Sequence, residues 1–474
     1  MRTKLNTFWH FTQSLYPHEL DYLMSVQNFK KEINLKILKQ IYNNCHSDHP
    51  PLLFDTSIDK RAYSYVKEWI INSLEKIDVD VFFEWLIMMD KKVLTDIISP
   101  SDEAEILSYM KIIKPTHYYF VRFYELLQYY RDYLLVRNRT KYNALIASYL
   151  DTYEKYYLKS VEINKELHLI TANIVKRDTD KYRQEIENIL RQIYFDEELD
   201  GYTRYRAIVR LTIFFYNYRQ FDKQLVMYRH LDELCKTPLF YSKRLLANYY
   251  ANRAMMHSKL NELALAEKYA YLSIQNNNSD YLFYLINLCS VLVKQGKNKE
   301  VYHLMQESLP QLKNTNNTYY KIGFVSFYIK TLLVNHQYKK AVDYADNYFN
   351  AYKKDILLHR WHLFFCSYLQ ALILSEKYLQ ILSLCRRYNL ITKENHRINR
   401  ADYMPIILLY SLLSEYMENI IDKDKLINSI VHATKLLMRD KYRSYKIMEL
   451  LDEISELVPI EIKVVKKTLL SYLE

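Results

Sequence analysis

Glycine is nearly absent from this chain of 474 residues, which contains only Gly201, Gly296 and Gly323. Average usage of about 7% would supply roughly thirty or more. Sheets, hairpins and tight βα connections consume glycine, whereas pairs of helices joined by short Asn- and Lys-containing turns need little of it. The depletion therefore predicts an all-α protein in which few turns require a positive φ.

The same scarcity excludes the common nucleotide-binding motifs. Walker-type and dinucleotide-binding loops need several closely spaced glycines, which this sequence does not contain. A Gly-rich nucleophile elbow and the His-Glu-x-x-His pattern of zinc proteases are also missing from it. No paired acid and base or activated nucleophile is recognisable, so we assign no catalytic residue and no cofactor, and predict that the chain is not an enzyme.

Cysteine is rare, odd in number and widely spaced, which favours buried reduced thiols and a cytoplasmic protein. The five cysteines are Cys45, Cys235, Cys289, Cys366 and Cys385. The longest apolar run, Met404 to Leu413, contains a proline and is shorter than the eighteen or so residues that a membrane span needs. We therefore expect no membrane span.

Two groups of side chains are of types that can bind metal ions, but we do not predict a metal site at either of them. Cys45, His46, Asp48 and His49 precede Pro50-Pro51, but no second Cys/His pair accompanies them, and an ordinary polar loop is favoured. Separately, His359 and His362 would share one helix face, but the sequence suggests no carboxylate partner for them. No metal ligand is assigned.

Apolar residues make up half of the chain and charged residues 26%, as in a protein with a sizeable core. Amphipathic segments near the N-terminus predict helices over Leu5–Leu15, His18–Cys45, Asp59–Glu75 and Val79–Ile98. Ser99-Pro100-Ser101-Asp102 has the composition of a helix start.

A recurring unit follows residue 202. Pairs three residues apart recur with steps of 42, 35, 40 and 40 residues, at Phe221/Gln224, Leu263/Ala266, Asn298/Val301, Tyr338/Ala341 and Tyr378/Ile381. Steps of this size are typical of stacked helical repeats.

The segment from Tyr249 to Ala254, followed by Leu260-Asn261-Glu262, Ala266 and Ser273, resembles the tetratricopeptide repeat (TPR). The next unit, from Asn287 and Cys289 through Gly296 to Val301 and Ser308, follows the same pattern, whereas 319–352 and 359–390 diverge from it. The resemblance covers about 202 to 390 and implies antiparallel helix pairs in which small residues such as Ala254 and Ala266 allow close approach. The N-terminal part is similar to the helical leader of uncharacterised bacterial repeat proteins.

We therefore predict an all-α protein containing an α-solenoid of TPR-like helix pairs. Its parts would be an N-terminal helical module over 1–115, a long-helix region over 116–200, the repeat array over 201–395 and a C-terminal helical cap over 396–474.

The TPR resemblance implies a peptide-binding groove on the inner helices. Arg206 and Arg210 lie one helical turn apart, and Asn252 and Asn287 occupy equivalent places 35 residues apart. This resembles the two-carboxylate clamp in which Asn and basic side chains hold an acidic peptide terminus. We expect a non-enzymatic scaffold or regulator that binds a peptide or protein segment; a merely solvated basic face is the alternative interpretation of these residues.

A nucleic-acid partner is the alternative function, because the net charge is +11. One basic cluster contains Arg131, Arg137, Arg139 and Lys141, with tyrosines between them. Stacking tyrosines beside a charged groove can hold single strands. Tyrosine occurs 48 times in this chain, however, so its presence beside arginine indicates little.

Overall fold

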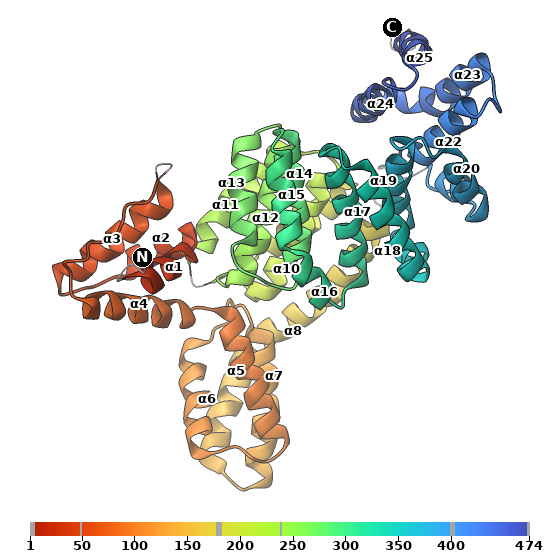
Figure 1. Cartoon of the computed structure of the whole chain (residues 1–474). Coiled ribbons are helices and arrows are strands. Elements are labelled where there is room, and N and C mark those ends of the chain that lie inside the picture. Colours follow the sequence, from red (N-terminus) through yellow and green to blue (C-terminus); the bar gives the residue numbers. More distant parts are fainter. Residues whose placement is uncertain (1–4, 48–49, 177–182, 238, 399–402, 472–474) are drawn as a thin grey trace. The chain divides into compact units, whose positions relative to one another are not determined.

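The computed structural model describes residues 5–47, 50–176, 183–237, 239–398 and 403–471 (Figure 1). Within these ranges every regular element is a helix, which confirms the predicted all-α class. The chain divides into two compact units, Met1–Asn278 and Ser279–Glu474, so the predicted array over 201–395 is shared between them. No helix in the described ranges is both long and apolar enough to cross a bilayer.

The first unit begins with four helices: α1 (Asn6–Gln13), α2 (Pro17–Val26), α3 (Glu32–His46) and α4 (Lys60–Glu75). The single helix predicted over His18–Cys45 is wrong. The chain becomes extended at Gln27, with ψ of 140°, and the Phe29 ring packs against Trp69 of α4 at a centroid distance of 4.5 Å. A contact with a distant helix thus interrupts a helical pattern.

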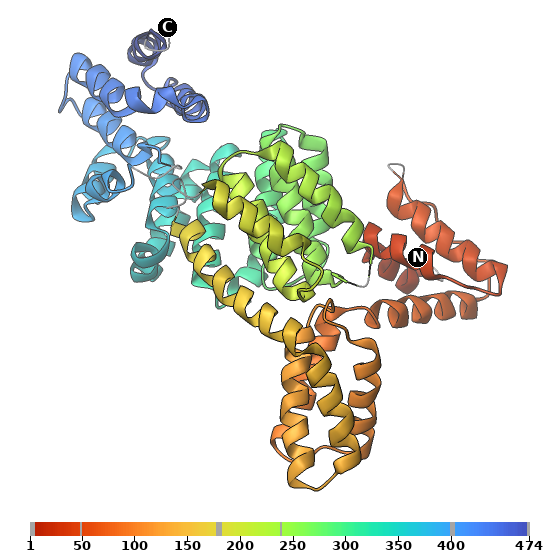
Figure 2. The same cartoon turned by 180° about the vertical axis from the view of Figure 1, so that it is seen from behind.

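A four-helix bundle follows, formed by α5 (Val79–Leu94), α6 (Pro100–Ile112), α7 (Phe120–Val136) and the first half of α8 (Thr140–Lys176). Ser99 caps α6 in a capping box with Asp102, as its sequence predicts. The second half of α8 leaves the bundle and packs against α10 (Gly201–Asn217), where Asn164 Nδ2 donates to Thr203 Oγ1 at 2.6 Å (Figure 2). The single helix α8 therefore belongs to the four-helix bundle with its first half and packs on α10 with its second half.

The remaining helices of the first unit are α9 (Arg183–Phe195), α11 (Phe221–Cys235), α12 (Lys243–Lys259) and α13 (Leu263–Ile274). Helix α12 packs closely against α13, and α9 against α10. Ala254 of α12 and Ala266 of α13 are both fully buried. A side chain no larger than a methyl group at these positions allows two helix axes to approach closely.

The second unit contains successive helices that pack on their neighbours in sequence. Their bounds are α14 (Tyr281–Lys294), α15 (Asn298–Glu307), α16 (Leu309–Asn314), α17 (Thr318–Val334), α18 (Tyr338–His359), α19 (Trp361–Ile373), α20 (Tyr378–Arg387), α21 (Leu390–Asn395), α22 (Ile406–Met417), α23 (Lys423–Thr434), the 3-10 helix η2 (Lys435–Arg439), α24 (Lys441–Ile454) and α25 (Pro459–Leu470). Helix α18 has a kink at Tyr352.

One turn geometry recurs along the described chain. A residue with positive φ is followed by a residue whose N–H bonds to the carbonyl five positions earlier, which is the Schellman helix ending. The residues with positive φ in these turns are Asp96, Asn138, Arg219, Asn261, Gly296, His336, Glu376 and Asn419. From Arg219 to Glu376 they are spaced by 42, 35, 40 and 40 residues, the same steps that the sequence shows.

The expectation that few turns need a positive φ is therefore wrong. Among the described residues, eight non-glycine residues and Gly296 adopt it. Asn and Asp tolerate this conformation because their short polar side chains can bond locally, but Arg219, His336 and Glu376 do not share that advantage to the same degree. Glycine is scarce here because other residues accept the strain, not because left-handed turns are rare.

Replacing Glu376 with glycine is expected to stabilise the second unit by roughly 0.5–1 kcal/mol, because glycine relieves a left-handed residue although it adds entropy to the unfolded chain. Urea unfolding would measure the change. Asn261→Gly is the matched control and should have a smaller effect, since asparagine adopts this conformation more readily. A destabilised Glu376→Gly variant would contradict the strain argument.

Candidate peptide-binding surface

Arg206 and Arg210 lie side by side on α10 and reach across to α8. The Arg206 guanidinium donates to Asn164 Oδ1, and Arg210 Nε donates to Thr171 Oγ1. Arg210 Nη1 also donates to the backbone oxygen of Arg206 at 2.7 Å. Both arginines are half-buried. The two guanidinium groups are thus held in place by neutral oxygen atoms.

Neither of these guanidinium groups forms an ion pair with a carboxylate among the residues that the structure describes. Burial, followed by the nearby charge of Arg206, lowers the pKa of Arg210. The charge of Arg206 disfavours the charged form of Arg210, and an anion bound between the two guanidinium groups would offset their mutual repulsion. The arrangement therefore favours a carboxylate or phosphate group as a ligand.

Helix α12 continues this polar surface on the other side of α10. Tyr205 donates its hydroxyl to Asn248 Oδ1 at 3.2 Å, and Asn252 Nδ2 donates to the same oxygen at 3.0 Å. Asn252 is half-buried. We call the α8–α10–α12 face the surface formed by Asn164, Thr171, Tyr202, Arg206, Arg210, Asn248 and Asn252. Tyr202 is 40% exposed, and its ring centroid lies 5.5 Å from the Arg206 guanidinium carbon.

The recurring turns show which of the predicted site residues occupy equivalent positions in successive repeats. Arg210, Asn252 and Asn287 each lie nine residues before the positive-φ residue of their own turn, at Arg219, Asn261 and Gly296. These three residues are therefore structurally equivalent. Asn287, however, lies on α14 of the second unit and is only 8% exposed, so its side chain offers little surface to a ligand.

Sequence reasoning missed Asn164, Thr171 and Asn248. A signal was available, since Asn164 precedes Arg206 by 42 residues and Thr171 precedes Arg210 by 39, about one repeat length. The recurring pattern is recognisable only after residue 202, whereas the second half of α8 lies before that position. Applying the same step toward the N-terminus would have found both side chains.

The group around Cys45 is in part outside the described residues, which include neither Asp48 nor His49. His46 Nε2 lies 3.2 Å from Asp21 Oδ1, and its ring stacks on Tyr42. Burial raises the pKa of Cys45 to about 12, so this thiol is protonated at neutral pH. In the described ranges, no group of three or more His, Cys, Asp or Glu side chains is arranged to hold a metal ion.

The expectation that His362 lacks a carboxylate partner is wrong. His362 Nε2 lies 2.9 Å from Glu394 Oε1, and the Glu394 carboxylate also accepts the backbone N–H groups of Ile407 and Leu408 at the start of α22. Glu394 is fully buried. The nearby Cys366 is buried as well, which raises its pKa to about 12. This cluster fastens α19 and α21 to the α22 N-terminus and leaves the thiol unreactive.

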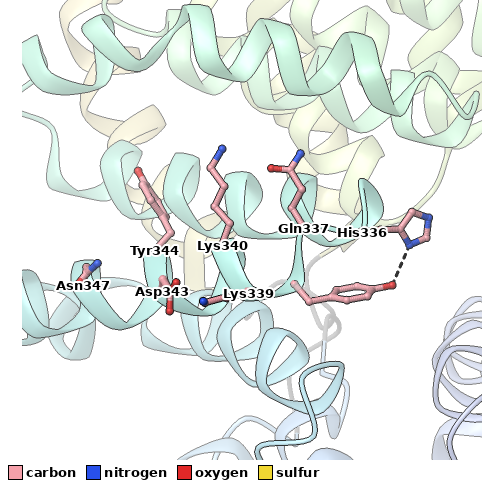
Figure 3. A pocket seen from close by; sticks show the side chains of 8 residues that line it. His336, Gln337, Lys339, Lys340, Asp343, Tyr344 and Asn347 are labelled. Atoms are coloured by element: carbon pink, nitrogen blue, oxygen red, sulfur yellow. Dashed lines mark hydrogen bonds between the residues drawn. The ribbon is translucent and has the colours of Figure 1, made fainter.

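A shallow pocket in the second unit lies along one helix, and Figure 3 shows Gln337, Lys340 and Tyr344 pointing to the same side of α18. Lys340 Nζ donates to the Tyr302 hydroxyl at 2.8 Å, and this hydrogen bond lowers the pKa of Tyr302. Because the pocket is lined only by residues 336–347 and is open to solvent, it supplies no enclosed site for chemistry.

No family model, curated protein or solved structure matches this chain.

Proposed function

We propose that this protein is a non-enzymatic scaffold or regulator that binds an acidic peptide or protein segment on its α8–α10–α12 face. The observation that carries the proposal is the Arg206–Arg210 pair, two half-buried cations whose hydrogen-bond partners among the described residues are all neutral oxygens. Holding two like charges together without a carboxylate is unfavourable in the free protein. A ligand carboxylate that accepts from both would remove that cost.

Several features support a peptide as the ligand. Asn248 and Asn252 on the adjacent helix carry amides, which can both donate to and accept from an extended backbone. The recurring turns and the buried Ala254 and Ala266 agree with a TPR-like array, and such arrays use their inner helices to bind peptides. We extend the proposal to that fold assignment and to a cytoplasmic location, for which the buried free cysteines are the support.

The test uses a fluorescein-labelled peptide with two C-terminal aspartates, prepared with a free and with an amidated C-terminus. Anisotropy should show tighter binding of the free acid. Arg206→Gln combined with Arg210→Gln should weaken binding by about 100-fold, since each charge-assisted hydrogen bond contributes about 1.5 kcal/mol or more. Arg210→Glu with Asn252→Ala should abolish it, while the melting temperature changes little.

The matched control replaces Arg386 and Arg387 of α20, both exposed, with glutamine. This change removes the same charge from the second unit and should leave peptide binding nearly intact. Equal weakening by the two pairs would show that the peptide responds only to net charge. Unchanged binding by the Arg206/Arg210 variant would remove the α8–α10–α12 face from consideration.

A further inference from the structure

The end of the four-helix bundle exposes an unusual set of aliphatic side chains. The turns α5–α6 and α7–α8 lie together at this end, joined by an ion pair of 2.9 Å between Arg137 and Asp96. We call residues 91–97 and 131–141 the bundle tip. Its exposed aliphatic residues are Leu94 (61%), Ile97 (62%), Leu135 (53%) and Val136 (79%). Exposed apolar patches with a polar rim mark interaction sites on protein surfaces.

Ile97 differs from the residues at the same place in most of the other helix-ending turns. Ile97 follows the positive-φ residue of its turn, Asp96. The residues at the equivalent place are polar in six of the seven other turns, at Arg139, Gln220, Glu262, Lys297, Gln337 and Lys377, and the seventh carries Ile420, which is 54% exposed. An exposed isoleucine is therefore not a requirement of the turn. Hydrogen bonds of 3.0 Å close both tip turns, from Ile97 N to Lys92 O and from Arg139 N to Leu134 O. The exposed aliphatic side chains are therefore attached to regular, hydrogen-bonded turns.

Basic residues surround the aliphatic side chains. The tip contains Lys91, Lys92, Arg131, Arg137, Arg139 and Lys141, against the acidic residues Asp96 and Asp132. Four of these cations are paired with a carboxylate: Lys92 with Asp102, Arg139 with Glu103, Arg137 with Asp96 and Arg131 with Asp132. Among the described residues, exposed Lys91 and Lys141 are the two tip cations outside these pairs. The tip therefore combines an apolar end with an excess of positive charge.

The opposite end of the bundle is already occupied within the first unit. Arg244 of α12 forms an ion pair of 2.6 Å with Asp80 at the start of α5. The N–H of Tyr202 donates to the Tyr118 backbone oxygen at 2.9 Å. In the described part of the chain, these contacts join that end of the bundle to the rest of the first unit, whereas the tip end carries the two helix-ending turns.

We infer that the bundle tip docks on the surface of an anionic membrane, with Leu94, Ile97, Leu135 and Val136 entering the boundary between headgroups and acyl chains. A bilayer accepts aliphatic side chains at shallow depth without a complementary groove, and anionic headgroups attract the surrounding lysine and arginine side chains. Nucleic acid would use the same cations but offers its phosphate backbone, which has no favourable contact for four aliphatic groups.

The experiment is co-sedimentation of the full chain with vesicles of phosphatidylcholine alone or mixed with phosphatidylserine. The wild type should bind the mixed vesicles at least tenfold more strongly. The variant with Leu94, Ile97, Leu135 and Val136 all changed to glutamine keeps the charge and should lose at least tenfold in binding. Lys91→Gln and Lys141→Gln should each reduce the phosphatidylserine dependence by about fivefold.

A second quadruple variant controls for general loss of apolar surface. It changes Leu358, Leu379, Leu436 and Ile460 of the second unit, which are 64% to 76% exposed, to glutamine and should bind vesicles like the wild type. Circular dichroism should be the same for all variants. Equal vesicle binding by the tip variant would overturn the inference. So would binding of single-stranded RNA instead of vesicles, or concentration-dependent dimerisation that the tip variant abolishes.

Discussion

Changing Asp200 to asparagine is expected to remove a pH dependence of about 4 kcal/mol from the stability of the first unit. Asp200 precedes α10 and is only 1% exposed, and burial raises the pKa of its carboxyl from 3.8 to about 7. Hydrogen bonds from Ser160 and Thr203 offset this effect only in part. Each pKa unit corresponds to about 1.4 kcal/mol, which gives the expected size.

Whether stability rises or falls with pH depends on which state, folded or unfolded, binds the proton of Asp200 more tightly. The folded protein keeps Asp200 protonated up to about pH 7, whereas the unfolded chain ionises near pH 3.8. The stabilisation that Asp200 contributes to the folded state is therefore largest below pH 3.8. It falls as the pH rises toward 7 and no longer changes above that pH. The free energy of unfolding in urea should decline by about 3 kcal/mol between pH 5 and pH 8 because of this carboxyl alone.

The Asp200→Asn variant should lack that decline and be more stable than the wild type at pH 8. Asp222, exposed in the first turn of α11, is the matched control, and Asp222→Asn should preserve the wild-type slope. Parallel pH profiles for wild type and Asp200→Asn would show that this carboxyl is solvated rather than buried.

Enlarging Ala266 to leucine should destabilise the first unit by about 3 kcal/mol. Ala266 is fully buried in α13 and faces α12, where Ala247, Ala251 and Ala254 are also buried. The extra atoms have no space between the two helices, so the helices must separate or adopt strained rotamers.

Ala264 provides the control for this prediction, because it lies two residues earlier on the same helix and is exposed. Ala264→Leu adds the same atoms to the surface and should change the free energy of unfolding by about 0.5 kcal/mol or less. Urea unfolding of both variants measures the difference. Similar values for the two substitutions would mean that α12 and α13 do not approach as closely as the structure indicates.

Local patterns were sufficient to predict several elements. The repeat steps of 42, 35, 40 and 40 residues reappear as the spacing of the helix-ending turns from Arg219 to Glu376. The start of α6 at Pro100, after a Ser99 cap, follows from four consecutive residues. Such features depend on residues within one or two helical turns of each other, and they can therefore be predicted from the sequence alone.

The candidate site was only partly predictable. Arg206 and Arg210 were expected to share a helix face because of their spacing, and the structure places them side by side. Their partners Asn164 and Thr171 come from about one repeat earlier, and nothing within α10 identifies them. Asn287 is equivalent to Asn252 in the repeat, but the exposure of its side chain depends on which neighbouring helices cover it, and it is buried.

The sequence alone was enough to predict that the chain is helical, that α6 begins at Pro100 after a Ser99 cap, and that units of about forty residues recur. Only the tertiary structure decided that α2 and α3 separate near Phe29, that Glu394 meets His362, that Asp200 loses its solvent, and that Ile97 and Val136 share one exposed end. The physical reason is that helix formation follows from neighbours along the chain, whereas desolvation and charge pairing depend on groups that only packing brings together.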